Sequence, residues 1–243
     1  MTDKRTVLVV GARQNSLGAS VAKVASEAGY EIVTAGLNAN QPGGEDVALD
    51  LMVDHYDNMV GLLKEYAPMH IVCTAGMNML KPEGNGDLRE WYRWHMETNF
   101  IGPMRLLDAW RVAMQDSDYL PEVKEPLHYV AISSNSARIP RTNSAAYCAS
   151  KAALSMGLRV AAREGEGGSY GYLVYGYEPG LLYGTPMTDQ ITNALPGVPL
   201  TRMQGFASAG LYVGDLARVI VSNLQARTVA FNGCLIPFDT GEQ

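Results

Sequence analysis

A tyrosine and a lysine, Tyr147 and Lys151, lie four residues apart in a segment rich in alanine. In a helix this spacing places both side chains on one face, so the lysine ammonium can lie close behind the tyrosine hydroxyl. A nearby cation favours the phenolate, and a tyrosine in such a setting can donate and accept protons near neutral pH. The pair has little specificity alone, because an exposed Tyr–Lys contact on an amphipathic helix has the same pattern.

A glycine-containing turn follows the first apolar run of the chain. Val7–Val10 leads into Gly11, and Ser16 and Gly18 come where a helix would begin. Gly11 permits a tight turn off a strand, and Gly18 removes a side chain where the helix and the strand must approach closely. The unpaired N–H groups and the positive dipole end of that helix could hold a pyrophosphate. The order of strand, turn and helix therefore favours a nucleotide site over an ordinary turn.

Short apolar runs alternate with longer amphipathic segments, and together they would position these residues. Strand-like runs lie at Thr6–Val10, Glu31–Ala35, Asp46–Leu49, His70–Thr74, Leu127–Ser133, Tyr170–Tyr175 and Cys234–Pro237. Helix-like patterns lie at Leu17–Ala28, Tyr56–Tyr66, Leu88–Met114, Ser144–Glu164 and Gly214–Leu224. This alternation predicts an α/β fold, a doubly wound parallel sheet of about seven strands with helices on both faces in a three-layer sandwich.

The composition excludes several classes of function. With 243 residues, 47% of them hydrophobic, the chain is long enough for one α/β domain with a full core. The net charge of −6 gives no basic footprint for nucleic acid. Cys73, Cys148 and Cys234 are scattered along the chain, so we expect neither a disulfide framework nor a metal site.

The chain shows no sign of a second domain or of a membrane segment. No linker or repeat interrupts residues 1–243, and we expect one domain. No apolar stretch approaches the length of a membrane span, and the run Val7–Val10 is too short for the core of a signal peptide, which predicts a cytoplasmic protein. The least regular region is Leu182–Val213, and an excursion from the domain is predicted at Leu182–Tyr212.

Several elements, taken in order, resemble the short-chain dehydrogenase/reductase family in its compact form. Tyr147 and Lys151 match the family's YxxxK motif. Ser134 falls where the family has its catalytic serine, and Asn99 begins a match to its NxxG motif. The resemblance implies a Rossmann-type fold in which Asn99, Ser134, Tyr147 and Lys151 are catalytic. It also implies that Asn99 holds a water in a proton relay and locally interrupts its helix.

The same resemblance implies a set of cofactor-binding residues. Asp50-Leu51 matches the pair beside the adenine ring, Ala75-Gly76 the end of the NNAG element, and Pro179-Gly180 the PG after the sixth strand. Asp239-Thr240-Gly241 is similar to the closing DGG. The predicted cofactor-binding residues are Gly11, Arg13, Asn15, Ser16, Leu17, Gly18, Gly36, Asp50, Leu51, Ala75, Gly76, Tyr147, Lys151, Pro179, Gly180 and Thr185.

Three departures from the family pattern affect this reading. The glycine loop is one residue longer than usual and has Ser16 for its middle glycine, as in the family's divergent enoyl reductases. The Tyr–Lys spacing instead favours the carbonyl reductases. Cys73-Thr74 replaces a pair of asparagines, and the threonine expected to contact the nicotinamide arrives one residue late, as Thr185.

The end of the second strand bears on the choice of cofactor. Gly36 occupies the place where NAD-specific relatives carry an acidic side chain that would repel a 2′-phosphate. Its small size leaves room, and Arg13 could pair with that phosphate. Leu37, where many NADP enzymes have arginine, argues the other way. We predict a preference for NADP(H) over NAD(H).

The predicted activity is the interconversion of a carbonyl and a secondary alcohol by hydride transfer, with Tyr147 as the general acid and base. An enoyl reductase, an epimerase or dehydratase, and a non-catalytic nucleotide sensor on the same fold are the alternatives. The family resemblance implies a homotetramer, and small residues on the Tyr147 helix suit close helix packing: Ala145, Ala146, Ala149, Ala152 and Ala153.

The excursion at Leu182–Tyr212 is predicted to be a lid over a small, apolar substrate, because the family has its substrate-binding loop there. Apolar anchors are Met187, Ile191, Leu195, Met203 and Phe206, and candidate hinges are Gly184, Gly197 and Gly205. A permanently packed surface segment, or an interface, is the alternative interpretation of this region.

Overall fold

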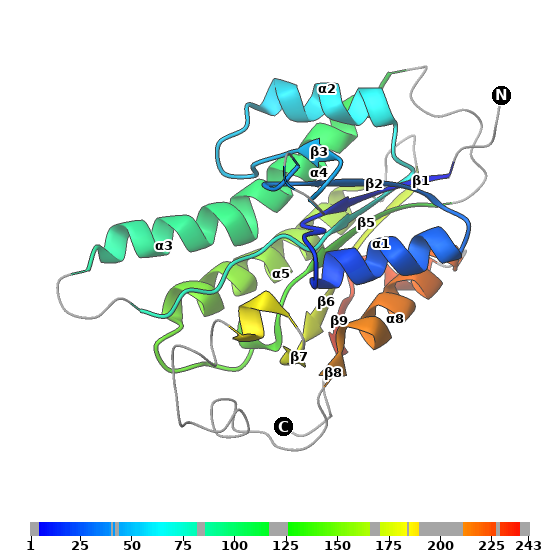
Figure 1. The fold of residues 1–243 in the computed structure, drawn as a ribbon. Helices are drawn as coiled ribbons and strands as arrows, with labels where there is room; N and C mark the ends of the chain where they lie inside the picture. The colour runs from blue at the N-terminus through cyan, green and yellow to red at the C-terminus, as the bar shows by residue number, and fades with distance from the viewer. Residues whose placement is uncertain are drawn as a thin grey trace.

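Figure 1 shows the computed structural model, which describes residues 5–39, 41, 44–81, 86–116, 126–165, 171–183, 185–189, 211–226 and 229–238. Seven strands form one sheet in the order β3-β2-β1-β4-β5-β6-β9, and every neighbouring pair is parallel. The strands are β1 (Thr6–Val10), β2 (Glu31–Gly36), β3 (Val47–Ala48), β4 (His70–Cys73), β5 (Leu127–Ile132), β6 (Tyr172–Pro179) and β9 (Leu235–Phe238). The predicted doubly wound parallel sheet is confirmed.

Helices cover both faces of this sheet (Figure 1). One face carries α1 (Leu17–Glu27) and α8 (Val213–Gln225), and the other carries α2 (Tyr56–Tyr66), α4 (Gly102–Ala113) and α5 (Ala145–Gly165). The shorter elements are α3 (Leu88–Met96), the π-helix η1 (Glu97–Ile101), and the 3₁₀ turns η2 (Asn135–Ala137) and η3 (Val229–Phe231).

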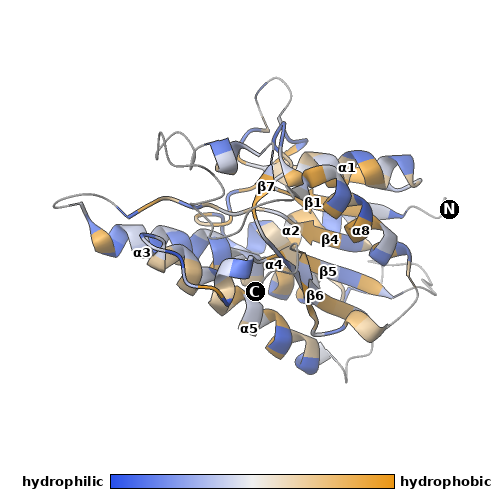
Figure 2. Cartoon of the chain, turned by 90° about the horizontal axis from the view of Figure 1, so that it is seen from below, coloured by the Kyte–Doolittle hydropathy of each residue, from blue (hydrophilic) through white to orange (hydrophobic). Residues whose placement is uncertain are grey.

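Alternate residues of the strands face two separate cores. In β1, Leu8 and Val10 pack under α2, α4 and α5, whereas Val7 and Val9 pack under α1 and α8. Because both faces are covered, the central strands are largely apolar rather than alternating, as Figure 2 shows. The sheet order changes direction between β1 and β4. Ligands of doubly wound sheets bind at such a point, beyond the carboxyl ends of the strands.

The helix predicted over Leu88–Met114 is divided into three parts, and this is a correction to the sequence prediction. Within η1 the hydrogen bonds lengthen by one residue, so that the Gly102 N–H donates to the Glu97 carbonyl. At the centre of this turn the Asn99 side chain bonds to the backbone of Met77 instead of facing its own helix. The local interruption that the sequence predicted at Asn99 is therefore a π-helical turn.

The two ends of the predicted excursion lie side by side. Strand β7 (Leu182–Tyr183) pairs in parallel with β8 (Leu211–Tyr212), and the chain turns helically at 186–189 between them. The sequence analysis did not predict this small sheet. The lid anchors Ile191, Leu195, Met203 and Phe206 and the hinges Gly184, Gly197 and Gly205 lie outside the described residues, as does Asp239-Thr240-Gly241.

Candidate functional site

A cavity of about 800 Å³ opens at the carboxyl ends of the central strands. Residues following β1, β2, β4, β5 and β6 all contribute to its wall. Of the predicted catalytic and cofactor-binding residues, all line this cavity except Asn15, Gly18 and Asn99. The structure thus brings together residues from positions 11 to 185, as the sequence analysis expected.

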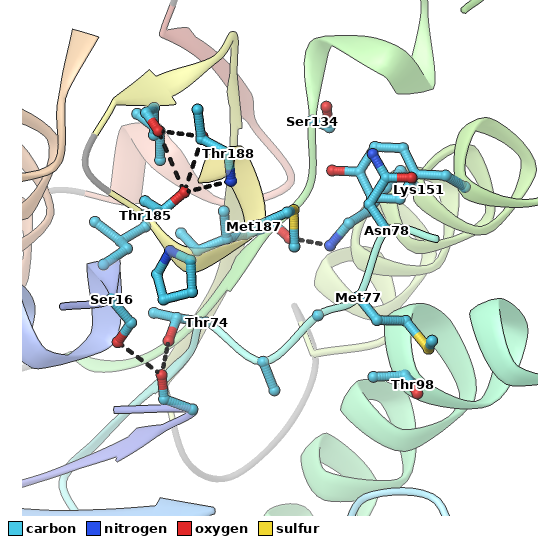
Figure 3. Close-up of a pocket in the computed structure, with 18 of the residues that line it drawn as sticks. Ser16, Thr74, Met77, Asn78, Thr98, Ser134, Lys151, Thr185, Met187 and Thr188 are labelled. Carbon is cyan, nitrogen blue, oxygen red and sulfur yellow. Dashed lines mark hydrogen bonds between the residues drawn. The ribbon is translucent and has the colours of Figure 1, made fainter. Parts of the chain in front are cut away.

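The glycine loop is held tightly against β4. Gly11 has a φ of +85°, and a Cβ on it would lie 2.8 Å from the Ala75 nitrogen. Ser16 caps α1: its Oγ accepts from the Ala19 N–H (3.1 Å) and donates to the Gly11 carbonyl (3.2 Å) (Figure 3). Ser16 and Leu17, at the start of α1, line the cavity, and the N–H groups of a first helical turn can bind an anionic group there.

Gly18 fits the close approach that its position in the sequence predicted. A Cβ there would lie 2.5 Å from both the Gly11 carbonyl oxygen and the Thr74 Oγ1. We expect Gly18→Ala to destabilise the protein by about 1–3 kcal/mol through overpacking and to weaken dinucleotide binding. Urea unfolding and titration calorimetry with NAD⁺ measure the two effects.

Gly61 of α2 provides the matched control, because an added Cβ there meets nothing within 4 Å. Gly61→Ala should stabilise the protein by up to about 1 kcal/mol through helix propensity and leave nucleotide binding unchanged. If the unfolding midpoints of Gly18→Ala and Gly61→Ala agree, the packing argument is wrong.

Thr74 supplies the hydrogen bonds that the replaced asparagines left in question. Its Oγ1 lies 2.9 Å from the Val10 carbonyl oxygen and 3.1 Å from that of Gly11, and its N–H donates to Val10. The ends of β1 and β4 are therefore tied together without an asparagine. The neighbouring Cys73 is buried, and burial raises the pKa of its thiol to about 11, so that it stays protonated at neutral pH.

Asn99 supports the cavity from behind and does not line it. Its amide nitrogen donates to the Met77 carbonyl (2.9 Å) and to Ser150 Oγ (3.0 Å), and its carbonyl accepts from the Met77 N–H (2.8 Å). Both amide hydrogens are thereby used, and only the carbonyl oxygen retains capacity to hold a water. The predicted proton-relay role stays a prediction.

His95 was not identified from the sequence, although it stabilises the same wall. Its Nε2 accepts from the Met79 N–H (3.1 Å), and its Nδ1 donates to the Trp91 carbonyl (2.7 Å). The Trp91 indole in turn donates to the Met79 carbonyl (2.8 Å). Burial lowers the pKa of His95, which keeps it in the neutral form that can accept from Met79. The spacing of Trp91 and His95, one helical turn apart, was the available signal.

Ser134, Tyr147 and Lys151 meet where β5 ends and α5 begins. Ser134 caps η2 by accepting from the Ser136 N–H (3.1 Å), and it lines the cavity together with Tyr147. Lys151 donates from Nζ to the Ile132 carbonyl (2.8 Å) at the end of β5 (Figure 3). The same Nζ lies 5.9 Å from the centre of the Tyr147 ring.

Burial dominates the electrostatics of this pair. It raises the pKa of Tyr147 above its ordinary value, and the polar hydroxyl of nearby Ser134 opposes this shift only in part. Burial also lowers the pKa of Lys151 to about 8. The sequence analysis expected the lysine to favour a tyrosine phenolate near neutral pH. In this arrangement burial instead raises the pKa of Tyr147, which is a protonated phenol at pH 7.

The cavity wall contains further residues that the motifs did not indicate. They include Glu45, from the connection between β2 and β3, and also Met77, Asn78, Leu80, Arg141 and Asn143. Thr185 lines the cavity as predicted, and its hydroxyl contacts the Leu182 carbonyl and Thr188 Oγ1 (Figure 3). In the described part of the chain, no group of three or more His, Cys, Asp or Glu side chains could hold a metal.

A doubly wound sheet with a glycine loop at its switch point defines a nucleotide-binding enzyme of the Rossmann type. Residues 5–196 match the short chain dehydrogenase family, and the chain belongs to this family. It is an NAD(P)-dependent oxidoreductase that acts on small molecules. None of the described helices has both the length and the apolar composition that a membrane crossing requires.

Similar solved structures include a 3-oxoacyl-[acyl-carrier protein] reductase from Brucella melitensis in complex with NAD. Its TM-score is 0.78 at 22% identity, with 98% of this chain and 96% of that chain covered. The ligand-free aldohexose dehydrogenase of Thermoplasma acidophilum has a TM-score of 0.76 at 19% identity, covering 98% and 93%. At these identities the likeness shows the fold alone. No match was found among curated proteins.

Proposed function

We propose that this protein interconverts a carbonyl and a secondary alcohol, with a nicotinamide cofactor and with Tyr147 as the general acid and base. The observation that carries the proposal is the placement of the hydroxyl-bearing side chains of Ser134 and Tyr147 in the wall of one cavity, with Lys151 in the same wall one turn of α5 after Tyr147. A carbonyl oxygen bound between these hydroxyls would receive hydrogen bonds from both.

The residues at the other end of the cavity fit a dinucleotide. Gly11 and Gly18 let the turn pack closely against Thr74 and Ala75, and the capped start of α1 offers N–H groups to a pyrophosphate. Asp50 and Leu51 line the wall toward β3, where an adenine would lie. The bound cofactor supplies or accepts the hydride.

The protein's own residues manage the proton and the developing charge. In the reduction direction, Tyr147 donates its proton to the substrate oxygen as negative charge builds on that oxygen. Ser134 donates a second hydrogen bond to the same oxygen. Lys151 binds the ribose hydroxyls next to the nicotinamide, and Asn99 keeps Met77 and Ser150 in place beside it.

The direction of the reaction should depend on pH. Reduction requires the protonated phenol, and its kcat/KM should fall as pH rises and Tyr147 ionises. Oxidation requires the phenolate, and its kcat/KM should rise over the same pH range. The loss of charge on Lys151 above pH 8 opposes the ionisation of Tyr147. It therefore broadens the fall of kcat/KM for reduction and its rise for oxidation. Initial rates in both directions between pH 6 and 10 measure this, and parallel profiles would contradict it.

Two other functions are distinguished by one assay. An enoyl reductase is supported by Ser16 in the glycine loop, and a non-catalytic nucleotide sensor is possible on any such fold. Cofactor oxidation should be followed with a panel of ketones and, separately, with enoyl thioesters. Turnover of ketones alone supports the proposal. Turnover of enoyl thioesters alone would assign an enoyl reductase, and cofactor binding without turnover of either would assign a sensor.

The substrate, assembly and location remain proposals of the same kind. An apolar substrate is supported by Met77, Leu80 and Met187 in the cavity wall. A homotetramer is supported by α5, whose exposed face carries Ala149, Ala152 and Met156, and light scattering tests it. A cytoplasmic location stays a prediction. The predicted preference for NADP(H) depended on open space beside Gly36, where the side chain of Glu45 lies.

A further inference from the structure

The carboxylate of Glu45 occupies the position that a side chain on Gly36 would take. A Cβ on Gly36 would lie 2.5 Å from Glu45 Oε1 and 2.7 Å from its Cδ. From standard bond lengths, an aspartate at position 36 would hold its own carboxylate oxygens roughly 2.4 Å from that Cβ. Glu45 lies in the connection from β2 to β3, and its side chain therefore places a carboxylate at the end of β2.

Contacts of Glu45 hold the carboxylate in this place. Its Oε2 accepts from the Asn38 N–H at 3.0 Å, just beyond the end of β2. The side chain is 4% exposed, yet it belongs to the cavity wall together with Gly36, Leu37 and Asn38. A buried, anchored carboxylate at a cavity wall retains its position when a ligand enters.

The end of β2 lies next to the glycine loop, because the Gly11 N–H donates to the Ala35 carbonyl at 2.8 Å. In dinucleotide-binding folds, an acidic side chain about 20 residues after the glycine turn accepts hydrogen bonds from the adenosine ribose. Such an acidic side chain discriminates against a 2′-phosphate on this ribose, because the carboxylate and the phosphate are both negatively charged and repel each other.

We propose that Glu45 is the residue that selects the cofactor, and that the enzyme prefers NAD(H). The carboxylate accepts hydrogen bonds from the ribose 2′ and 3′ hydroxyls and excludes a 2′-phosphate. This inference rests on the proposed function only in requiring a nicotinamide dinucleotide. It reverses the preference predicted from the sequence, which assumed that Gly36 left the site without an acidic group.

The test measures binding rather than turnover. Titration calorimetry should compare NADH with NADPH, and 5′-AMP with 2′,5′-ADP, on wild type and Glu45→Gln. We expect wild type to bind NADH at least about tenfold more tightly than NADPH, and Glu45→Gln to reduce that ratio at least about tenfold. Asp46→Asn is the control, because Asp46 is an exposed carboxylate on the same connection, bonded to Thr34, and its ratio should stay unchanged.

A second variant tests whether the position of the carboxylate is what matters. Gly36 has no positive φ, so the Glu45 side chain is the obstacle to a side chain there. Glu45→Ala should lose the preference for NADH, and the double variant Glu45→Ala/Gly36→Asp should regain it. This pair keeps the test decisive if Glu45→Gln folds poorly.

The outcomes separate this inference from the proposed function. If wild type binds NADPH as tightly as NADH, or if Glu45→Gln leaves the ratio unchanged, the role of Glu45 is wrong while the oxidoreductase proposal stands. If wild type binds neither dinucleotide, both are wrong. If Asp46→Asn changes the ratio of NADH to NADPH affinity as much as Glu45→Gln does, the effect is one of general charge, and the specific role of Glu45 is wrong.

Discussion

Replacing Tyr147 by phenylalanine is expected to abolish turnover while leaving cofactor binding nearly unchanged. The hydroxyl alone is removed, and the buried ring keeps its packing on α5. General acid–base groups contribute about 10²–10⁴-fold to a rate, and loss of the proton donor should reduce kcat by that factor. Steady-state kinetics on the preferred ketone and calorimetry with the cofactor measure the two quantities.

Tyr177→Phe is the matched control for this experiment. Its hydroxyl is also buried, but it accepts a hydrogen bond from Asn223 (2.5 Å) on the α8 side of the sheet, away from the cavity. It should lose some stability and keep its kcat. A Tyr147→Phe enzyme that retains most of the wild-type kcat would refute the mechanism, whereas equal losses in both variants would indicate a structural effect.

Lys151→Met should reduce kcat/KM by about 10³ and also weaken cofactor binding by about tenfold, because a single ammonium serves the proton transfer and the ribose. Methionine fills much of the volume of the lysine stem, so the effect reports the charge and not a cavity. Kinetics and calorimetry together test the two parts, and unchanged cofactor affinity would remove Lys151 from the ribose.

The stability of Lys151→Met provides an independent readout with a definite sign. Folding lowers the pKa of Lys151 from 10.5 to about 8, so an ammonium buried at pH 7 costs stability. Between pH 8 and 10.5 the folded lysine is neutral while the unfolded one keeps its proton, and wild-type stability rises. Any advantage of the variant at pH 7 should therefore shrink across this range. Lys64→Met, which loses only an exposed ion pair with Asp116, should change neither stability nor activity appreciably.

The sequence predicted most strands and helices because their apolar pattern and their position agree. β1 and α2 begin and end where expected: β1 is a short apolar run between Arg5 and Gly11, and α2 is an amphipathic run between His55 and Ala67-Pro68. β6 extends beyond the predicted Tyr175 to Pro179, although Gly176 and Glu178 interrupt the apolar run. Glu178 is tolerated inside because Ser155 (2.9 Å) and Arg138 (2.5 Å) donate to its carboxylate.

The candidate site was predictable where a motif fixes a residue and unpredictable where a side chain arrives from another element. Tyr147 and Lys151 meet because helix spacing requires it. Glu45 reaches the Gly36 position only through the path of the connection between β2 and β3, which no local pattern encodes. The pKa of Tyr147 was misjudged for a similar reason, because desolvation depends on what covers the ring.

The π-helical turn at Glu97–Ile101 implies that the site is sensitive to a change of a single residue in length. A π turn holds one more residue than an α turn, so deleting Thr98 would let α3 and α4 join as one regular helix. Asn99 would then rotate by about 100° and its amide would no longer meet Met77 and Ser150. In evolutionary terms, one codon gained or lost here separates a helix that only packs from one that also supports the site. Variation in length should therefore be rarer in this turn than in the connections around it.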